Sequence, residues 1–532
     1  MEMEISLASS VSSLLLVTLS MVYLYYTTRR RSKSSPHRRL PPSPPGWPVI
    51  GHLHLLSDMP HHALAELSRS MRAPLLGLRL GTVRAVVIST PDVARAALTT
   101  HDAALSSRPG LLSGRVLSFG CSAVTYTPSG PYHRVARRVL VAELLSPRRV
   151  EAYAGVRAEE VRRLLARLSS HASSSSSTVD LGKCFLNLAN DVLCRVAFGG
   201  RFRHENSDRL SVVVDDVNEL FGGFSIADCF PELEPCSSLT GFRRRLKSSD
   251  ADLRKFCDDV VDEHISGKRH RRIPGDESES FVDVLLRVQK SSELDVPLTI
   301  DNVKALVRLG GWFSQDIFIG GTDATFTTPE RVMAELVRHP GALKKAQNEV
   351  RRVVGGKGYV EESGLGELHY MRAAIKEALR LHPPVPLLVQ RESVAPCTLG
   401  GYDIPARTRV LINAFAMGRD PEVWENPLQY SPERFMNGGG SDIDIKDPEY
   451  KMLPFGGGRR GCPGYTFAMA TVQLLLASLL YHFEWALPDG VSAMDVNLDE
   501  SFRLTTRKKE PLLVIVRKSE GYEFKGEELN DV

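Results

Sequence analysis

The sequence predicts a mainly α-helical protein with small β-sheets, behind an N-terminal transmembrane helix. Residues 5–26 carry no charge, strand-like runs at 76–80 and 84–89 come early in the main part of the chain, and long helical stretches follow, among them the apolar run 465–483. At 532 residues the chain can bury a large core. Because no internal repeat is visible, we expect one large domain.

The apolar segment 5–26 is long enough to anchor the chain in a membrane. Its 22 residues measure about 33 Å as a helix, and the hydrocarbon core of a bilayer is about 30 Å thick. Two glutamates precede the segment and six Lys and Arg residues follow it between 29 and 39. The positive-inside bias therefore places the rest of the chain in the cytosol. A cleaved signal peptide is the alternative, which the acidic start and the basic flank disfavour.

Composition divides the chain into four parts. We expect a membrane anchor at 1–28, a basic and proline-rich linker at 29–48, the main domain at 49–518 and a polar surface tail at 519–532. Within the main domain, the serine tract 169–177 is expected to be a solvated loop, and the segment 437–441, with its three glycines, a flexible insertion.

Charge and cysteine content exclude some classes of partner and site. The net charge of +4 is small for a chain of this size and argues against binding to nucleic acid. The eight cysteines are scattered, with no CxxC pair and no zinc-like cluster. Scattered single cysteines suit a reducing, cytosolic compartment, in which seven would serve packing and one would be a ligand.

The segment Phe455–Gly464 is the most informative part of the sequence. It places Cys462 in a glycine-rich loop just before the helical run that begins at Tyr465. Backbone N–H groups and the positive end of a helix lower the pKa of a thiol there, and glycines let the backbone approach a flat ligand. With Arg460 placed to pair with a carboxylate, the loop suits the proximal side of a heme. The alternative is a buried cysteine in a glycine-rich turn.

Two further motifs precede this loop. Glu377 and Arg380 are three residues apart in a helical stretch and can pair on one face. Most such pairs are solvated surface pairs, but Arg434 of the segment Pro432–Phe435 lies between this pair and Cys462 in the sequence. We expect a buried Glu377–Arg380–Arg434 cluster that braces the cysteine loop.

A heme at this loop would also need residues that bind its carboxylates and residues that line the other side of its ring, the distal side. The basic run 132–138 has a solvated helix face as its ordinary interpretation, but His133 and Arg137 are candidates to meet heme propionates together with Arg391 and Arg460. The segment 320–325 sets two glycines inside a helical stretch, at a cost of about 1 kcal/mol each. We expect a groove there, with Asp323 and a nearby hydroxyl relaying protons.

Together these motifs resemble the cytochrome P450 superfamily, in the order typical of its plant microsomal members, from about residue 40 to residue 518. The resemblance implies the cytochrome P450 fold, heme b with iron bound by Cys462, and oxygen bound beside Gly321 with Asp323 and Thr325 in proton delivery. It implies contacts to heme from six further residues: His133, Arg137, Arg391, Phe455, Arg460 and Gly464. It also implies a single-pass protein of the endoplasmic reticulum membrane that faces the cytosol and takes NADPH electrons from cytochrome P450 reductase.

The resemblance implies monooxygenation of a small aromatic amine, with the conversion of tryptamine to serotonin as the expected reaction. A plant P450 of specialised metabolism that acts on another small hydrophobic substrate is an alternative. This chain departs from the family in its distal segment, where Ala324 replaces the usual threonine and residues 306–315 include an insertion of about seven residues. Pro329 and Arg331 replace Leu and Trp, and Arg503 replaces a glycine. These departures leave two alternatives open: a heme enzyme that does not activate oxygen, and a heme-binding protein without turnover.

Overall fold

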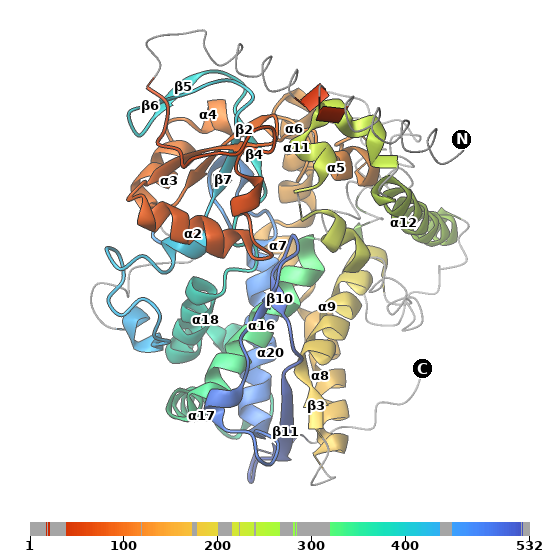
Figure 1. Ribbon diagram of the computed structural model, residues 1–532. Coiled ribbons are helices and arrows are strands. Elements are labelled where there is room, and N and C mark those ends of the chain that lie inside the picture. Colours follow the sequence, from red (N-terminus) through yellow and green to blue (C-terminus); the bar gives the residue numbers. More distant parts are fainter. Residues whose placement is uncertain are drawn as a thin grey trace, which may run out of the picture.

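The computed structural model describes most of the chain after residue 38. The described residues are 17–18, 20–21, 39–118, 120–172, 178–199, 215–222, 224–238, 241–265, 280–281, 284, 320–436, 449–522 and 524. Figure 1 shows the strands β2, β4, β5, β6 and β7 with several short helices in the upper part of the molecule, and most of the longer helices below, with β3, β10 and β11 beside them. The expected membrane span 5–26 lies outside the described residues apart from four of them, and the insertion at 306–315 and the segment 437–441 lie wholly outside.

The main sheet has four strands in the order β1-β2-β7-β4. Strands β1 and β2 pair antiparallel through a tight turn, with Leu80 opposite Val83, while β2 runs parallel to β7. Both early strands begin and end within one residue of their expected bounds, which confirms the strand prediction. Strand β4 places Arg391 opposite Val410 on β7. The four strands are β1 (Leu75–Leu80), β2 (Val83–Ile88), β7 (Arg409–Ile412) and β4 (Arg391–Glu392).

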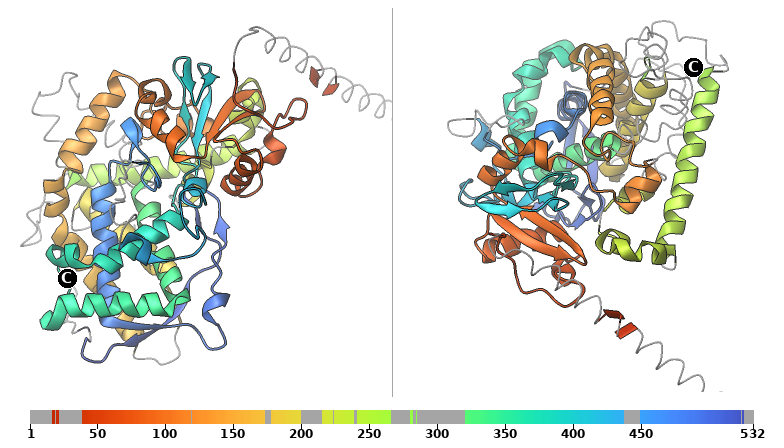
Figure 2. Two further views of the ribbon diagram at one scale, coloured as in Figure 1. Left: turned by 90° about the vertical axis from the view of Figure 1, so that its left-hand side faces the viewer. Right: turned by 90° about the horizontal axis from the view of Figure 1, so that it is seen from above.

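The largest hydrophobic core lies between the long helices. Helix α16 packs against α9 and α20, and α18 packs against α16 and α17 (Figures 1 and 2). Among the described helices, α20 alone is long and apolar enough to cross a membrane, but 72% of it is buried, which is typical of a core helix. These helices are α8 (Ala154–His171), α9 (Leu181–Phe198), α16 (Gly320–Arg338), α17 (Pro340–Val354), α18 (His369–Leu381) and α20 (Tyr465–His482).

Shorter elements surround the sheet and the core. The remaining helices before residue 300 are η1 (Leu53–Leu55), α2 (Pro60–Ser70), α3 (Pro91–Leu98), α4 (Asp102–Leu105), α5 (Leu112–Leu117), α6 (Pro131–Val139), η2 (Leu140–Leu144), α7 (Pro147–Ala152), α11 (Ile226–Cys229), η3 (Pro231–Ser238) and α12 (Phe242–Ile265). Later helices are η5 (Gly355–Lys357), η6 (Glu362–Glu367), α19 (Ala414–Met417), η7 (Pro432–Phe435), η8 (Gly458–Arg460) and η9 (Ala493–Asp495). The remaining strands are β3 (Thr178–Asp180), β5 (Cys397–Leu399), β6 (Tyr402–Ile404), β8 (Phe483–Ala486), β9 (Glu500–Ser501), β10 (Arg507–Lys508) and β11 (Leu513–Lys518).

Helix α16 continues through Pro329 without a break. Proline lacks the N–H that would bond the carbonyl of Thr325, so a kink or a break is the usual outcome. The helix nevertheless extends from Gly320 to Arg338, and nearly all of its residues after Gly321 are buried. Tertiary packing on several sides therefore holds the helix together despite the lost hydrogen bond.

Two segments expected from composition to lie on the surface are partly helical or packed. The serine tract was expected to form a loop from residue 169, but α8 includes Ser169 and Ser170 and ends at His171, while 173–177 lie outside the described residues. The polar tail was expected to lie on the surface from residue 519. Ser519 is instead buried, and the carbonyl of Tyr522 accepts a hydrogen bond from His482 at 2.9 Å. Single aromatic residues in polar segments therefore add packing that average composition does not reveal.

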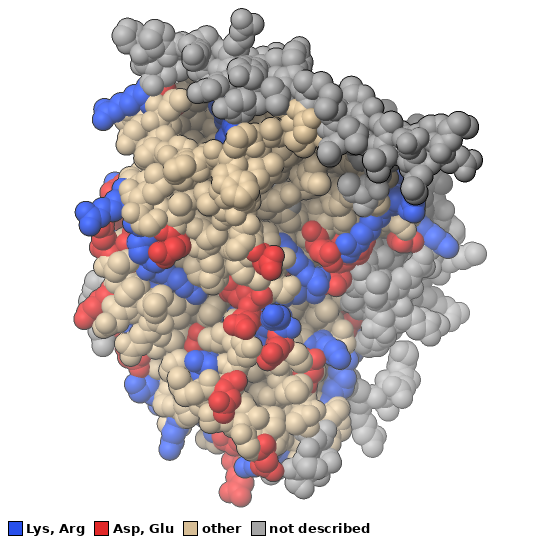
Figure 3. Space-filling model, viewed as in Figure 1, with Lys and Arg blue, Asp and Glu red and all other residues tan. Residues whose placement is uncertain are grey.

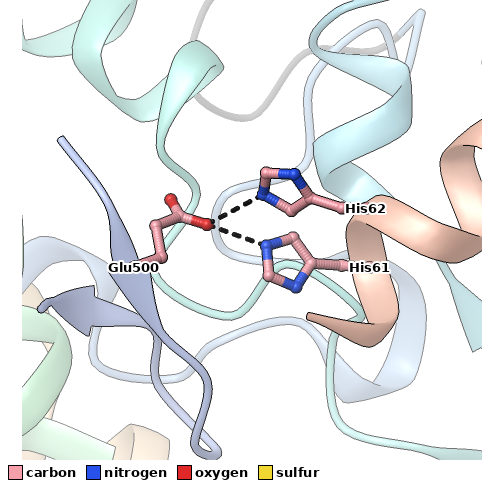
Figure 4. Close-up of side chains that lie close together, drawn as sticks. All are labelled: His61, His62 and Glu500. Carbon is pink, nitrogen blue, oxygen red and sulfur yellow. Dashed lines mark hydrogen bonds and ion pairs between the residues drawn. The ribbon is translucent and has the colours of Figure 1, made fainter. Parts of the chain in front are cut away.

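The C-terminal hairpin β9–β10 is tied to helix α2 through Glu500. The Nε2 atoms of His61 and His62 lie 2.8 and 3.2 Å from the same carboxylate oxygen of Glu500 (Figure 4). Arg331 of α16 approaches the other oxygen at 3.4 Å. Burial alone would raise the pKa of Glu500, but hydrogen bonds from His382, His61 and His62 outweigh it and hold this pKa well below its usual range. Arg331, one of the departures from the family, is thus accommodated by a buried carboxylate.

Charged side chains are unevenly distributed on the face shown in Figure 3. Lys, Arg, Asp and Glu gather over the lower, helical half, whereas the upper part is mostly uncharged. Helix α11 lies in this upper part (Figure 1), and its Ile226 is 61% exposed. Large apolar side chains exposed to water in this way are typical of surfaces that contact a partner or a membrane.

Candidate heme-thiolate site

The cysteine loop has a tight, glycine-dependent backbone. The Cys462 N–H donates to the carbonyl of Phe455 at 2.9 Å and the Gly461 N–H donates to Gly458 at 3.1 Å. Gly458 has a φ of +61°, which residues with a side chain rarely adopt, and a Cβ there would lie 2.6 Å from Oδ1 of Asp102. This folding leaves the Cys462 side chain exposed on the wall of a cavity, so it is not a buried packing cysteine.

This cavity, which is bounded by described residues, has a volume of about 230 Å³. Phe455, Arg460, Cys462 and Gly464 line one side, as expected from the sequence. Phe455 packs edge-on against Tyr465 at the start of α20, with ring centroids 5.1 Å apart.

Four guanidinium groups also line this cavity. Arg391 donates to Oδ1 of Asp102 at 2.9 Å and to the carbonyl of Gly457 at 2.7 Å. Arg137 donates to the carbonyl of Gly461 at 2.6 Å, and Arg460 binds the carbonyls of Ser106, Val124 and Thr127. The structure therefore brings together all three arginines expected from the sequence and ties two of them to the cysteine loop.

Arg108 is the fourth arginine, and sequence reasoning missed it. It is buried and donates to the carbonyls of Thr125 and Gln390, each at 2.8 Å. Burial, followed by repulsion from Arg391 and Arg460, lowers its pKa well below the usual value. Because these partners lie on other segments of the chain, the local sequence around Arg108 offers no signal that it belongs to the site.

His133 lies beside this arginine group as a neutral imidazole. It is buried, and its Nε2 atom has no hydrogen-bond partner among the described residues. Burial is the largest cause that lowers its pKa to about 4, followed by the positive charges of Arg460, Arg137 and Arg108. An unpartnered buried nitrogen next to several cations is suited to bind an anionic ligand.

Helix α16 forms the opposite side of the cavity. Gly320, Gly321, Ala324, Thr325 and Thr328 line it, so the hydroxyl-bearing Thr325 and the atypical Ala324 both belong to the distal wall. The glycine at 321 also serves helix packing, since a Cβ there would lie 3.1 Å from Cδ1 of Leu193 on α9.

Asp323 does not line the cavity. Its carboxylate is fully buried and pairs with Arg507 of strand β10, with Nη2 2.5 Å from Oδ1. Arg507 also pairs with Asp215, which Arg503 contacts at 2.5 Å. Burial raises the pKa of Asp323 to about 6, and Arg507 opposes this shift. The expected proton donor therefore lies behind the distal wall, and the atypical Arg503 belongs to the ionic network around it.

The expected buried cluster of Glu377, Arg380 and Arg434 is confirmed, while its action on the cysteine loop stays a prediction. Glu377 and Arg380 are almost completely buried, and Nη2 of Arg380 lies 2.7 Å from Oε1 of Glu377. Arg434 approaches the same oxygen at 3.0 Å, and the Ser431 N–H donates to it at 2.9 Å. Helix α18 is thereby fastened to the segment that leads to the cysteine loop.

Comparisons with known proteins agree with this geometry. A family model described as Cytochrome P450 matches residues 41–514. The chain belongs to the cytochrome P450 family. As a member it is a monooxygenase with a heme-thiolate iron cofactor. The donor set fits that group, because one thiol faces a cavity along which buried guanidinium groups offer partners for two carboxylates.

Three relatives illustrate the range of similarity. The chain is 70% identical to the tryptamine 5-hydroxylase of Oryza sativa subsp. japonica over 532 residues, all of both chains. It is 40% identical to the strychnine-11-hydroxylase of Strychnos nux-vomica over 90% of this chain and 91% of that one. A solved zebrafish cytochrome P450 with progesterone matches 86% of this chain and 99% of its own, with a TM-score of 0.70 and 23% identity, which supports the fold alone.

Proposed function

We propose that this P450 hydroxylates tryptamine at carbon 5 of the indole ring and so produces serotonin. The observation that carries this proposal is the 70% identity over all 532 residues to the rice enzyme named tryptamine 5-hydroxylase. In the balanced reaction, tryptamine, O₂, two electrons and two protons give serotonin and one water. The electrons come from NADPH through cytochrome P450 reductase.

In this proposal the proximal residues hold the cofactor. The thiolate of Cys462 would ligate the iron, and Phe455 and Gly464, which line the same cavity, would contact the heme. Arg137, Arg391 and Arg460 would bind the two carboxylates together with His133; the three arginines line the cavity, and the pKa of His133 is lowered by burial and by the charges of Arg460 and Arg137, which supports this proposal. When bound, the heme supplies oxygen activation and transfer of one oxygen atom. The protein supplies position, a low dielectric and protons.

The distal residues supply protons and exclude bulk water. Gly321 and Ala324 leave room for a small ligand, and the Thr325 hydroxyl holds a hydrogen-bonded water or donates a proton at the cavity wall. Asp323 lies on the same helix behind this wall, and a pKa of about 6 lets it exchange a proton near neutral pH.

The lining of the cavity suits an indole ring. Val385, Leu388, Val389 and Leu504 contribute an apolar surface, against which a flat aromatic ring buries a large area. Among the described residues that line it there is no carboxylate. Asp323 of helix α16 is not among the lining residues and pairs with Arg507.

Spectroscopic titration of the purified heme-loaded protein tests the substrate proposal. Tryptamine is expected to displace the iron-bound water and shift the heme from low spin to high spin. Tryptophan should give a weaker shift, because its additional carboxylate costs free energy to bury in this cavity. A neutral terpene of similar size is the control. A stronger and tighter response to the terpene than to tryptamine would contradict the proposal.

We also propose the expected arrangement in the cell. Residues 1–28 anchor the chain in the endoplasmic reticulum membrane, 29–48 link the anchor to the heme domain at 49–518, and 519–532 follow as the tail. The linker already contacts the heme domain at Arg39, because the Asp403 N–H donates to the carbonyl of Arg39 at 2.7 Å. The uncharged upper surface that includes α11 supports a domain resting against the membrane.

A further inference from the structure

Asp102 is a buried carboxylate that joins two parts of the heme site. It is the first residue of helix α4, and its side chain is only 7% exposed. Its Oδ1 atom accepts a hydrogen bond from Nη1 of Arg391 at 2.9 Å, and its Oδ2 atom accepts one from the backbone N–H of Arg459 at 2.9 Å. One carboxylate therefore contacts both an arginine of the cavity wall and the cysteine loop.

These contacts close a ring around the start of the cysteine loop. Arg391 donates to the carbonyl of Gly457 while Asp102 accepts from the N–H of Arg459, so the loop is held on both sides of Gly458. Gly458 fits against the carboxylate so tightly that a Cβ would lie 2.6 Å from Oδ1 of Asp102 and 2.7 Å from the carbonyl of Leu98. The lack of a side chain at 458 is thus explained by Asp102 as well as by the positive φ.

We infer that Asp102 is a positioning residue that sets the cysteine loop and Arg391 relative to each other, and so maintains thiolate ligation of the iron. This inference rests on the proposed role of Cys462. A charged acceptor forms stronger hydrogen bonds than a neutral one, and a backbone N–H left without its buried acceptor is costly. Cys462 lies three residues after Arg459, so movement of Arg459 moves the sulfur.

Two substitutions separate the two actions of this carboxylate. Asp102→Asn keeps an oxygen that can accept from the Arg459 N–H but removes the negative charge beside Arg391. Asp102→Ala removes both. Asp92→Asn is the matched control, because Asp92 lies on the neighbouring helix α3, is 89% exposed at its side chain and pairs only with Arg95 among the described residues.

The test uses the purified, heme-loaded full-length chain. The first readout is the rate at which the reduced, CO-bound thiolate-type band converts to the thiol-type band. We expect Asp102→Ala to raise this rate by about tenfold, since it removes the acceptor of the Arg459 N–H and the anionic partner of Arg391, and Asp102→Asn to raise it less. The second readout is the heme reduction potential. Both variants should raise the reduction potential, because removal of a negative charge near the heme favours the addition of an electron. The control Asp92→Asn should leave the potential unchanged.

The outcomes separate this inference from the proposed function. If the wild-type chain shows no thiolate-type band, both are overturned. If the wild type shows the band but Asp102→Ala and Asp102→Asn match it in conversion rate and potential, the inference about Asp102 alone fails. A lower melting temperature with an unchanged conversion rate and potential in the folded, heme-loaded fraction would show that Asp102 only stabilises the fold.

Discussion

Asp323 is a completely buried carboxyl group whose pKa lies close to neutral pH. Burial raises its pKa from 3.8 to about 6, and the nearby guanidinium of Arg507 limits the rise. The folded protein therefore binds this proton more tightly than the unfolded chain does. The resulting stabilisation is complete below about pH 4 and is lost as the pH rises through 6.

Asp323→Asn is expected to remove this pH dependence. The amide stays neutral, so the free energy of unfolding of the variant relative to the wild type should rise by on the order of 3 kcal/mol between pH 4 and pH 7. The ion pair with Arg507 forms only as Asp323 loses its proton, so its effect is already contained in this pKa and adds no separate offset. Denaturant unfolding at several pH values measures the difference, with Asp92→Asn as the surface control. A difference that falls with rising pH would contradict the assignment.

Among the elements, helix α16 carries most of the departures from the family. Its distal wall retains the hydroxyl of Thr325, while position 324 is alanine. Thr328 directs its hydroxyl back to the carbonyl of Ala324 at 2.8 Å, so this second hydroxyl is already engaged. We therefore propose Thr325 as the residue of this wall that helps to deliver protons.

Substitutions at positions 324 and 325 should change the amount of product formed per NADPH in opposite directions. Thr325→Ala is expected to lower product formed per NADPH by roughly tenfold and to raise hydrogen peroxide, because a general acid contributes 10²–10⁴-fold and water replaces part of it. Ala324→Thr should raise product per NADPH. Both quantities are measured in the presence of reductase and tryptamine. Unchanged coupling in Thr325→Ala would show that protons reach the cavity by another route.

Helix α18 supplies a second element-scale prediction through the brace around Glu377. Glu377→Ala leaves Arg380 and Arg434 without their shared buried acceptor, so the free energy of unfolding should fall by about 3–5 kcal/mol, with loss of heme. Glu361→Ala is the control, because Glu361 pairs with Lys357 at the surface and should leave stability unchanged. Equal stability of the two variants would exclude a bracing role for Glu377.

For the whole molecule, local motifs predicted the site better than they predicted its surroundings. The cysteine loop and the Glu377–Arg380 pair are encoded by glycine positions and by i,i+3 spacing, which neighbouring residues alone determine. Arg108 and Asp102 could not be found in this way, because the residues that they contact lie up to several hundred positions away. The orientation of Asp323 depends on Arg507 of a distant hairpin, and the burial of Ser519 depends on packing of the last strand.

Removal of residues 1–26 should move the protein from the membrane pellet toward the soluble fraction while heme binding persists. The expected anchor precedes the family match, which begins at residue 41, so the heme domain should fold without it. Some adhesion to membranes is expected to remain through exposed apolar side chains such as Trp47 and Ile226, which are 59% and 61% exposed. Sedimentation combined with the heme spectrum measures both effects. Loss of heme on truncation would show that the segment belongs to the fold.

Product analysis under ¹⁸O₂ tests the central claim most directly. The full-length chain is combined with reductase, NADPH and tryptamine, and the products are compared by mass spectrometry with serotonin and its positional isomers. The account predicts serotonin carrying one ¹⁸O atom, with the second atom in water, and no product from Cys462→Ala. Hydroxylation at another ring position, or tryptamine left unchanged by a chain with an intact thiolate-type spectrum, would contradict it.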